Sequence, residues 1–214
     1  VGVIFGGRSG EHEVSIRSAV SVLNALDRSR YEVIPIGITK EGKWLRARQA
    51  LALVSPEEEI HQTFQFGTPV VMAPEPVDHA SVDVVFPIMH GPFGEDGTIQ
   101  GLLELADVPY VGAGVLGSAV GMDKDVMKRL LRDAGLPIVD YWSLLRAGME
   151  MFLREHAATL PYPVFVKPAN LGSSVGITRV ASEDGLRDAI IEASEYDRKI
   201  IVEVFRLDMA ERRQ

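Results

Sequence analysis

Two apolar runs that end at glycine-containing loops place the strongest constraint on the fold of this chain. Val1 to Phe5 is apolar and stops at Gly6-Gly7, and Val82 to Met89 is mostly apolar and runs into a second glycine-containing loop. A strand without polar–apolar alternation is typical of a parallel sheet with both faces covered. A helix is expected after each loop, with apolar positions Val14, Ala19, Val22, Leu23 and Leu26 in the first and Ile99, Leu102, Leu103 and Ala106 in the second. The pattern predicts an open α/β sheet, which binds ligands at the carboxyl ends of its strands.

The loop Arg8 to Glu13 follows the first of these strands and leads into the first helix. Glu11 lies where the carboxyl end of the strand meets the helix N-terminus, and its carboxylate could hold an ammonium group there. The alternative is that Glu11 and Glu13 only suit the positive end of the helix dipole. This segment by itself leaves both interpretations open.

The loop His90 to Gly97 follows the second strand and contains three glycines and a proline. His90 stands at the carboxyl end of that strand, where open α/β sheets place ligands. A single histidine is more often structural, so ligand contact and a structural role both remain open for His90.

The segment Val164 to Gly176 supplies a second candidate site. The apolar run Val164 to Val166 is stopped by Lys167, a polar loop runs from Ala169 to Ser174, and a second apolar run, Val175 to Val180, follows. Successive backbone N–H groups with a lysine at the root of the loop can enclose an anion. We therefore predict two strands joined by a loop that covers a triphosphate. An ordinary hairpin with a surface lysine is the alternative.

A helix is predicted to begin after Asp123, which is a good N-cap, and to end at Gly135. Lys124 lies in its first turn, where a positive charge opposes the helix dipole, and this favours a bound anion nearby. A solvated lysine is the alternative. The apolar face of this helix consists of Val126, Met127, Leu130, Leu131 and Ala134.

Further elements follow from shorter patterns. We expect strands at Tyr31 to Thr39, Pro109 to Val111, Pro137 to Trp142 and Lys199 to Val204, a helix at Met149 to Ala158, and a helix capped by Ser182 with Leu186, Ala189, Ile190 and Ala193 facing inward. Residues 46 to 81 carry four prolines and little periodicity, so we expect loops there and give His61 and His79 no role.

Two short motifs are set aside. Gly112 to Gly117 matches G-x-G-x-x-G, a dinucleotide-binding pattern, but the strand before it is very short and it lies in the middle of the chain. Gly172 to Gly176 fits G-x-S-x-G, the nucleophile elbow of α/β-hydrolases, but all five histidines lie upstream of it and a strand rather than a helix follows.

Composition excludes several classes of protein. The formal net charge of −8 gives no electrostatic support to a nucleic-acid partner. The absence of cysteine excludes disulfides and is compatible with a reducing compartment. No apolar stretch is long enough to span a membrane, and no signal peptide is expected at Val1 to Phe5.

Five stretches in order resemble the D-alanine–D-alanine ligase family of the ATP-grasp superfamily: Gly6 to Ser15, His90 to Gly101, Pro109 to Gly114, Met122 to Lys124 and Val166 to Gly176. The resemblance covers the chain from Val1 to about Glu203. It implies an α/β fold with an N-terminal open parallel sheet domain, pre-ATP-grasp and Rossmann-like, followed by an ATP-grasp domain that is incomplete here. The implied domains are an N-terminal substrate-binding domain at 1–111, a central ATP-grasp subdomain with the phosphate-covering loop at 112–203, and a remnant of the C-terminal subdomain at 204–214.

The resemblance also implies a reaction for peptidoglycan precursor synthesis in the cytoplasm. ATP would phosphorylate one D-alanine, and a second D-alanine would attack the acyl phosphate to give the dipeptide. By the same resemblance, Glu11 would bind the ammonium group of the first D-alanine, with His90 near it, and Ser173 would link that site to the closing loop. The residues implied to contact ATP are Lys124, Lys167, Gly172, Ser173, Ser174, Glu203 and the backbone of Val204.

The resemblance ends after Glu203, where the tail Leu207 to Arg213 departs from the family pattern. The family uses Mg²⁺ or Mn²⁺ with ATP, but no metal ligand can be assigned in this sequence. We therefore expect the chain as given to form ATP and first-substrate surfaces without turning over. A D-alanine–D-lactate ligase, a non-catalytic nucleotide-binding fragment and a nicotinamide-dependent dehydrogenase resting on Gly112 to Gly117 remain as alternatives. Relatives of this kind are commonly homodimers, and we expect the same here.

Overall fold

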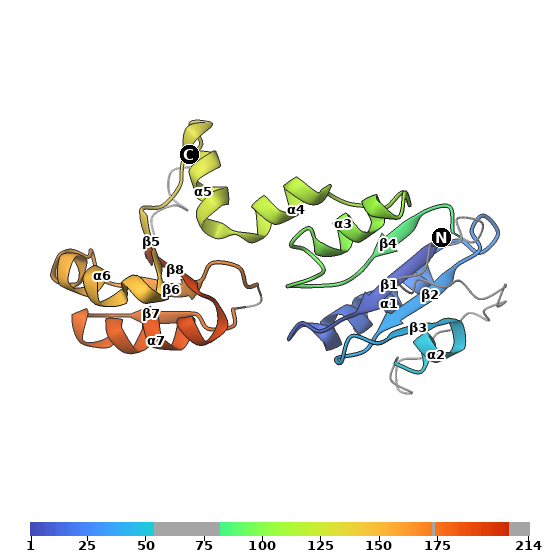
Figure 1. Ribbon diagram of the computed structural model, residues 1–214, viewed down its shortest axis with the longest axis horizontal. Helices are drawn as coiled ribbons and strands as arrows, with labels where there is room; N and C mark the ends of the chain where they lie inside the picture. Colours follow the sequence, from blue (N-terminus) through green and yellow to red (C-terminus); the bar gives the residue numbers. More distant parts are fainter. Residues whose placement is uncertain (54–81, 173, 206–214) are drawn as a thin grey trace. The chain divides into compact units, whose positions relative to one another are not determined.

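The computed structural model describes residues 1–53, 82–172 and 174–205, and the chain forms two compact units, Val1–Ala119 and Val120–Gln214 (Figure 1). Each unit contains one four-stranded sheet. We expected domain boundaries at residues 111 and 203. The two units are separated only by how densely their residues contact one another, so these boundaries stay a prediction. In the described part of the chain, no helix is both long enough and apolar enough to cross a membrane.

The sheet of the first unit is mainly parallel. It consists of β1 (Gly2–Gly6), β2 (Ile34–Ile38), β3 (Trp44–Arg46) and β4 (Val85–Pro87) in the order β3-β2-β1-β4. β1 pairs in parallel with both β2 and β4, and only β3 runs antiparallel, beside β2. The open parallel sheet predicted from the two apolar runs is therefore confirmed.

Both faces of β1 are buried, which explains its continuous apolar sequence. Val3 and Phe5 pack in one core with Ile16 and Leu23, whereas Ile4 belongs to a second core on the other side. The helices of this unit are α1 (His12–Ala25), α2 (Ala47–Leu51), α3 (Thr98–Leu105) and α4 (Val115–Met122), the last of which continues into the second unit. Helices on both faces leave no strand face for polar side chains.

Several predicted elements of this unit are shorter than expected. β2 covers Ile34–Ile38 of the expected Tyr31–Thr39 and matches the five residues of β1, whereas β4 covers Val85–Pro87 of the expected Val82–Met89 and pairs only with Gly2 to Ile4. Val14 and Leu102, which the sequence placed at apolar positions of their helices, are exposed, whereas Ile16 is buried on α1. The expected loop region 46–81 contains β3's end and α2 in its described part, whereas His61 and His79 lie outside the described residues.

The sheet of the second unit is antiparallel throughout. It consists of β5 (Tyr141–Leu145), β6 (Val164–Pro168), β7 (Thr178–Val180) and β8 (Lys199–Val204) in the order β5-β8-β6-β7. The strand expected at Pro137 to Trp142 instead runs from Tyr141 to Leu145, and the residue before it, Asp140, still accepts a hydrogen bond from the Val204 N–H of β8. β6 and β7 are the two strands predicted on either side of the Ala169–Ser174 loop.

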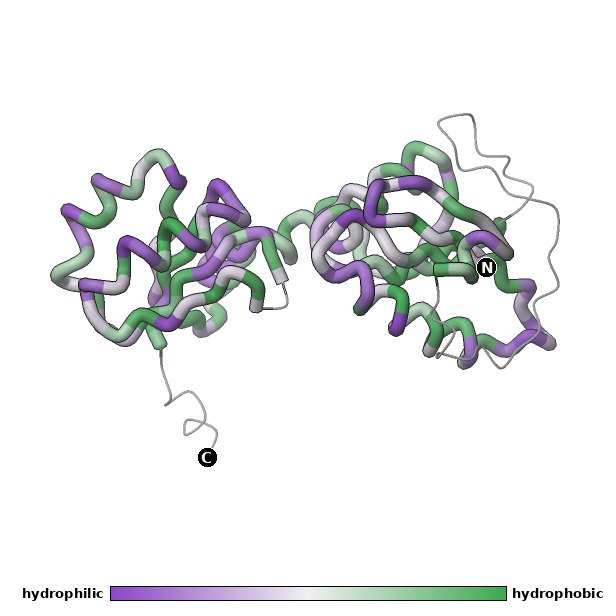
Figure 2. The backbone as a smooth tube through the Cα atoms, turned by 90° about the horizontal axis from the view of Figure 1, so that it is seen from below, coloured by the Kyte–Doolittle hydropathy of each residue, from purple (hydrophilic) through white to green (hydrophobic). Residues whose placement is uncertain are grey.

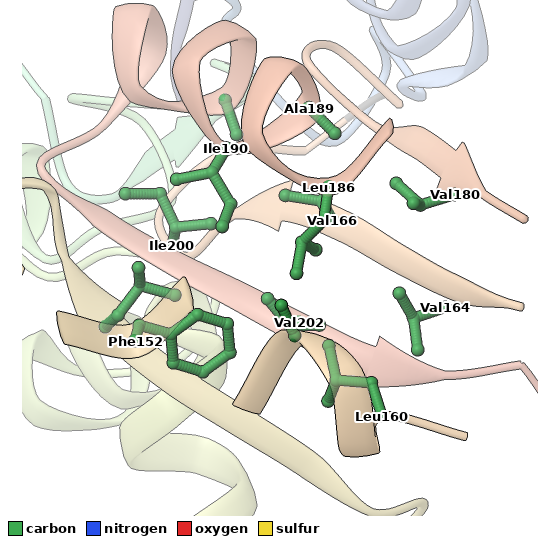
Figure 3. Packing of buried hydrophobic residues seen from close by; sticks show 13 residues of the cluster. Phe152, Leu160, Val164, Val166, Val180, Leu186, Ala189, Ile190, Ile200 and Val202 are labelled. Atoms are coloured by element: carbon green, nitrogen blue, oxygen red, sulfur yellow. The ribbon is translucent and has the colours of Figure 1, made fainter. Parts of the chain in front are cut away.

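One face of this sheet carries the apolar core of the unit (Figure 3). Leu186, Ala189 and Ile190 of α7 (Leu186–Tyr196) point toward Val166, Ile200 and Val202 of the sheet, as the sequence predicted for α7. Phe152 of α6 (Met149–His156) closes the core beside Leu160. Green and purple alternate along the helical turns in Figure 2, as expected of helices with one buried face.

The helix α5 (Lys124–Asp133) departs from the prediction. Leu130 and Ala134 of its expected apolar face are exposed, the other three residues of that face are half-buried, and the buried residues of the helix are Asp125 and Lys128. The expected apolar face is therefore only partly covered, and the most buried positions of α5 belong to charged side chains. Charged groups on the sheet attract the polar side of α5, as described below.

Helix termini in this unit also test the sequence patterns. The Asp123 side chain accepts hydrogen bonds from the N–H groups of Asp125 and Val126, which confirms it as the N-cap of α5. Ser182 makes no such bond, because the 3₁₀ turn η3 (Glu183–Gly185) separates it from α7. The predicted cap at Ser182 was wrong. Two further 3₁₀ turns, η1 (Arg146–Gly148) and η2 (Ala157–Thr159), flank α6.

Candidate functional site

In the first unit, the loop between β1 and α1 requires glycine at its start. Gly6 and Gly7 have φ of 85° and 104°, which L side chains rarely adopt. A Cβ at Gly6 would also lie 2.2 Å from the carbonyl oxygen of Ile38. The chain can therefore turn sharply at the carboxyl end of β1 and place the next residues over the edge of the sheet.

This turn brings Glu11 beside the His90 loop, although 79 residues separate Glu11 from His90 in the sequence. Ser9 Oγ donates a hydrogen bond to the His90 carbonyl oxygen at 2.7 Å and accepts one from the Glu11 N–H at 3.2 Å. Gly91 has φ of 68°, which favours glycine, and a Cβ there would lie 3.1 Å from Glu11 Oε1 and crowd this carboxylate. Both residues predicted for the first substrate therefore meet at one place.

His90 is oriented by residues that the sequence analysis did not select. Its Nε2 lies 3.0 Å from Ser18 Oγ of α1, and its Nδ1 lies 3.9 Å from Glu95 Oε1. Glu95 also accepts a hydrogen bond from the Gly91 N–H at 2.8 Å. Glu95 follows His90 by five residues in the same predicted loop, and this short spacing could have identified Glu95 as a partner of His90.

Two buried polar residues, His12 and Ser15, hold the same turn together. His12 Nδ1 lies 2.8 Å from the Gly7 carbonyl oxygen. Ser15 Oγ accepts a bond from the Gly6 N–H at 2.8 Å and donates one to the Ile88 carbonyl oxygen at 2.5 Å. Ser15 thus connects the ends of the two apolar runs, a role that only the folded sheet reveals.

In the second unit, Lys124 anchors the predicted phosphate-covering loop. Its Nζ donates hydrogen bonds to the carbonyl oxygens of Ala169, at 3.3 Å, and Leu171. Its backbone N–H also donates to the Ala169 carbonyl at 3.1 Å. Burial lowers the pKa of the Lys124 ammonium, and the positive charge of Lys167 lowers it further. A cation held at the base of a loop in this way can both fix the loop and face an anion.

Lys167 and Glu203 form the centre of a buried ion cluster with Lys128. Lys167 Nζ donates to Glu203 Oε2, and Lys128 Nζ pairs with Glu203 Oε1. The three side chains are only 10% to 17% exposed. Lys128 was missed by the sequence analysis, although it stands four residues after Lys124 and so lies on a neighbouring part of the same helix.

The carboxylate of Glu203 remains ionised in this environment. Burial raises its pKa, but the hydrogen bonds from Lys128 and Lys167 act more strongly in the opposite direction, and the pKa lies below its ordinary value. The cluster of two ammonium groups and one carboxylate therefore carries a net positive charge. Such a site attracts an anion.

A second set of ion pairs and hydrogen bonds fixes the surroundings of this cluster. Lys199 Nζ lies 2.5 Å from Asp123 Oδ2 and 3.7 Å from Asp125 Oδ2, which holds the start of α5 against β8. Asp197 Oδ2 accepts from the backbone N–H and the side-chain amide of Asn170, at 2.7 and 2.8 Å. The loop is thus fastened at its first residues.

The tip of the loop is only partly described. Gly172 is half-buried and accepts a hydrogen bond at 3.4 Å from the Val175 N–H, while Ser174 is exposed with φ of 61°. Ser173, predicted to serve both substrate and ATP, lies outside the described residues. Gly176, with φ of 66°, is required because a Cβ there would lie 2.7 Å from the ring of Tyr196.

The remaining predicted site features behave differently. The backbone N–H of Val204 donates a hydrogen bond to the Asp140 carbonyl oxygen at 3.0 Å, so this amide is already paired. Gly112 to Gly117 follows only a single bridge between Val85 and Tyr110 rather than a strand, and Gly172 to Gly176 leads into β7. Neither motif has the structural context that its usual function requires.

Metal binding finds no support in the part of the chain that the structure covers. Among residues 1–53, 82–172 and 174–205, no three His, Asp or Glu side chains gather where they could hold an ion. Asp123, Asp125 and Glu203 are instead paired with lysines. These residues therefore do not fit a resident Mg²⁺ site.

Comparison with known protein families gives two adjacent matches. The model of the D-ala D-ala ligase N-terminus matches residues 1–113, and the model of the D-ala D-ala ligase C-terminus matches residues 130–211. The first match covers the Glu11 and His90 loops, and the second covers Lys167 and Glu203.

Individual relatives agree with these matches. A D-alanine–D-alanine ligase of Solibacter usitatus is 52% identical over 203 residues, covering 95% of this chain and 55% of the relative. One of Rhodococcus erythropolis is 51% identical over 219 residues, covering 95% of this chain and 59% of the relative. The chain therefore spans less than two thirds of the length of these curated relatives.

Solved structures resemble this chain over nearly its whole length. The VanG D-Ala:D-Ser ligase from Enterococcus faecalis matches with a TM-score of 0.80 at 37% identity, covering 95% of this chain and 62% of that one. The D-alanine-D-alanine ligase from Coxiella burnetii matches with a TM-score of 0.75 at 36% identity, covering 95% and 63%.

Proposed function

The chain belongs to the D-alanine–D-alanine ligase family, and from this premise we propose that the protein containing it joins two D-alanines in an ATP-dependent reaction. In the first step, a carboxylate oxygen of one D-alanine attacks the γ-phosphorus of ATP and ADP leaves. In the second step, the amine of another D-alanine attacks the acyl phosphate, inorganic phosphate leaves, and a proton is released. The products are D-alanyl-D-alanine, ADP and phosphate.

The observation that carries this proposal is the ion cluster at the root of the phosphate-covering loop. Lys167 stands at the end of β6 and Lys124 binds the loop carbonyls, so two cations border one short segment. Cations placed in this way stabilise the negative charge that spreads over a transferring phosphoryl group. An acyl phosphate is hydrolysed by water, so a loop that closes over the reacting groups has a clear purpose. We assign Gly172, Ser173 and Ser174 to this cover.

The first unit supplies the proposed D-alanine site. The carboxylate of Glu11 lies beside Gly91, and His90 is oriented by Ser18 and Glu95. A carboxylate at this position can bind the ammonium group of an amino acid through a charge-assisted hydrogen bond. We propose that Glu11 orients the first D-alanine and that His90 lies against it. Glu203 and Val204 are assigned to the adenosine end of ATP.

The family also uses a divalent metal ion, which neutralises phosphate charge when it is bound. The described residues do not fit such a site, and no step proposed here passes through it. The proposed chemistry of this chain is therefore limited to binding ATP and the first D-alanine, orienting them, and excluding water.

The second substrate is the least defined part of the proposal. One structural relative is a D-Ala:D-Ser ligase, and a D-alanine–D-lactate ligase was an alternative from the sequence. D-Alanine is favoured as the second substrate, because curated relatives that are 52% and 51% identical to this chain carry the name D-alanine–D-alanine ligase. We further propose that the protein acts in the cytoplasm as a homodimer, which light scattering coupled to size-exclusion chromatography would test.

The experiment that tests the function is D-alanine-dependent release of phosphate from ATP by the whole protein that contains this chain, in the presence of Mg²⁺. The expected result is phosphate release only when D-alanine is added, together with formation of the dipeptide. D-Serine and D-lactate, each added beside D-alanine, identify the second substrate from the mass of the product. ATP binding without phosphate release would favour a nucleotide-binding fragment, and saturable NADH binding without ATP binding would favour a dehydrogenase.

A further inference from the structure

Lys128 is a buried lysine for which the proposed reaction has no role. Its side chain is 10% exposed, and it lies on a helix whose leucines are partly uncovered. A lysine is almost never buried unless it is paired, because burial removes the hydration of its charge. A leucine would fill this position at lower cost, so the charge of Lys128 requires an explanation.

The contacts of Lys128 are directed at Glu203. Its ammonium pairs with Glu203 Oε1 and lies 5.2 Å from the ring centre of Tyr141, whose face attracts a cation. Lys167 pairs with the other oxygen, Oε2, of the same carboxylate. Each oxygen of Glu203 therefore has its own lysine.

This arrangement matters when Lys167 changes partner. A lysine that is to bind phosphate must leave Glu203, and a buried carboxylate left without a cation is strongly unfavourable. Lys124 cannot take its place, because its ammonium group is bound to the carbonyls of Ala169 and Leu171. Lys199 is paired with Asp123 and Asp125. Lys128 is the cation in direct contact with the second oxygen of Glu203.

We infer that Lys128 is a positioning residue, which holds Glu203 ionised and in place so that Lys167 is free to bind the phosphates of a nucleotide. This inference rests on the proposed function for the identity of ATP as the ligand. The underlying chemistry is an exchange of ion pairs: Lys167 moves from carboxylate to phosphate, while Lys128 keeps the carboxylate neutralised.

The test compares binding of ATP and of inorganic tripolyphosphate to the wild-type chain and to Lys128→Met by isothermal titration calorimetry. Lys128→Met is expected to weaken both by about tenfold or more, because Lys167 must then stay with Glu203. Lys128→Arg keeps the charge and is expected to restore binding to within about threefold of wild type. Arg132→Met is the matched control, since it removes one exposed charge from the last turn of the same helix.

A double-mutant cycle separates positioning from simple loss of charge. In a Glu203→Gln background, Lys167 has no carboxylate to neutralise, so adding Lys128→Met is expected to change ATP affinity by less than about threefold. An equal loss in both backgrounds would mean that Lys128 acts only through its charge, and would overturn the inference. Unchanged binding by a folded Lys128→Met variant would overturn it as well.

The remaining outcomes are also decisive. If Lys128→Met does not fold, Lys128→Gln replaces it in the same comparison, and failure of both neutral variants to fold would assign Lys128 to stability and overturn the inference. If the wild type binds tripolyphosphate in a Lys128-dependent way but not ATP, the proposed function fails while the inference stands. If the wild type binds neither probe, both fail.

Discussion

At the scale of single residues, Lys167 is the central cation of the proposed nucleotide site. It stands at the end of β6 beside the loop and is only 17% exposed. Lys167→Ala is expected to weaken ATP binding about tenfold or more, because a buried charge-assisted contact is lost. Calorimetric titration with ATP measures this, with exposed Lys43→Ala as the control. Equal affinities for ATP in the two variants would contradict the assignment.

A substitution of Glu11 tests whether its carboxylate binds the ammonium group of D-alanine or only suits the positive end of the helix dipole. Glu11→Gln is expected to raise the KM for D-alanine about tenfold, because the ammonium group loses a charged acceptor. Glu13→Gln is the control, since Glu13 lies at the same helix terminus but is 65% exposed and pairs with Lys40 at 2.6 Å. The two KM values are compared in the phosphate-release assay. If neither variant changes KM, Glu11 only suits the helix dipole.

Glu203 links the site to the pH dependence of stability. Its pKa in the folded chain is lowered, so the unfolded chain binds more protons as the pH falls through the range of an ordinary carboxyl group. Its stabilising contribution is therefore complete above the ordinary pKa of 4.5 and is lost as the pH falls toward the lower folded value.

Glu203→Gln tests this contribution. At pH 7 the change leaves Lys128 and Lys167 without their carboxylate and is expected to lower the free energy of unfolding by about 3 kcal/mol. The difference from wild type should shrink below pH 4.5. Urea denaturation at several pH values measures both effects. Glu155→Gln, at a 60% exposed position of the same unit, is the control. A difference that is independent of pH would show that Glu203 has an ordinary pKa.

At the scale of elements, α5 is fixed by its N-terminus rather than by its apolar residues. Asp123 caps the helix and pairs with Lys199 of β8, so one side chain joins the helix to the sheet. Asp123→Ala is expected to lower the free energy of unfolding by about 1 to 2 kcal/mol. Asp123→Asn keeps a capping oxygen and should cost less.

Ser182→Ala is the control for this element-scale prediction. Ser182 has the sequence position of an N-cap but makes no capping hydrogen bond from its side chain. It should change stability by less than about 0.5 kcal/mol, as ordinary surface substitutions do. Thermal denaturation of the three variants is sufficient, and a larger loss in Ser182→Ala than in Asp123→Ala would contradict the capping assignment.

At the scale of the whole molecule, the two units have separate apolar cores. Leu23 belongs to a core of the first unit, whereas Leu186 belongs to the core of the second, and both are fully buried. Replacing either by alanine is expected to cost about 2 to 5 kcal/mol. Because the cores are separate, Leu23→Ala should speed hydrogen exchange in residues 1–119 and Leu186→Ala in residues 120–205. Exchange measured by mass spectrometry would contradict this if each variant loosened both units equally.

Much of the fold could be predicted from local sequence, because its signals depend on neighbouring residues. The apolar run Val1 to Phe5 predicts a strand buried on both faces, and Asp123 predicts a helix start, since each pattern reports local hydrogen bonding and burial. The loops around Glu11, His90 and Lys167 were found in the same way. Family membership followed from five such stretches in order.

The tertiary structure decided which groups meet. Spacing along the chain cannot show that Lys128 reaches Glu203 across 75 residues or that Ser18 orients His90 across 72 residues, because these contacts depend on strand order and register. The same reason explains why charged residues take the most buried positions of α5. Apolar periodicity predicts which side of a helix is buried only when no ion pair competes for that position. Here Lys199 and Glu203 of β8 pair with Asp125 and Lys128 of α5 and draw them inward. The sequence by itself determined the elements and the family, and only the folded chain determined the ion cluster.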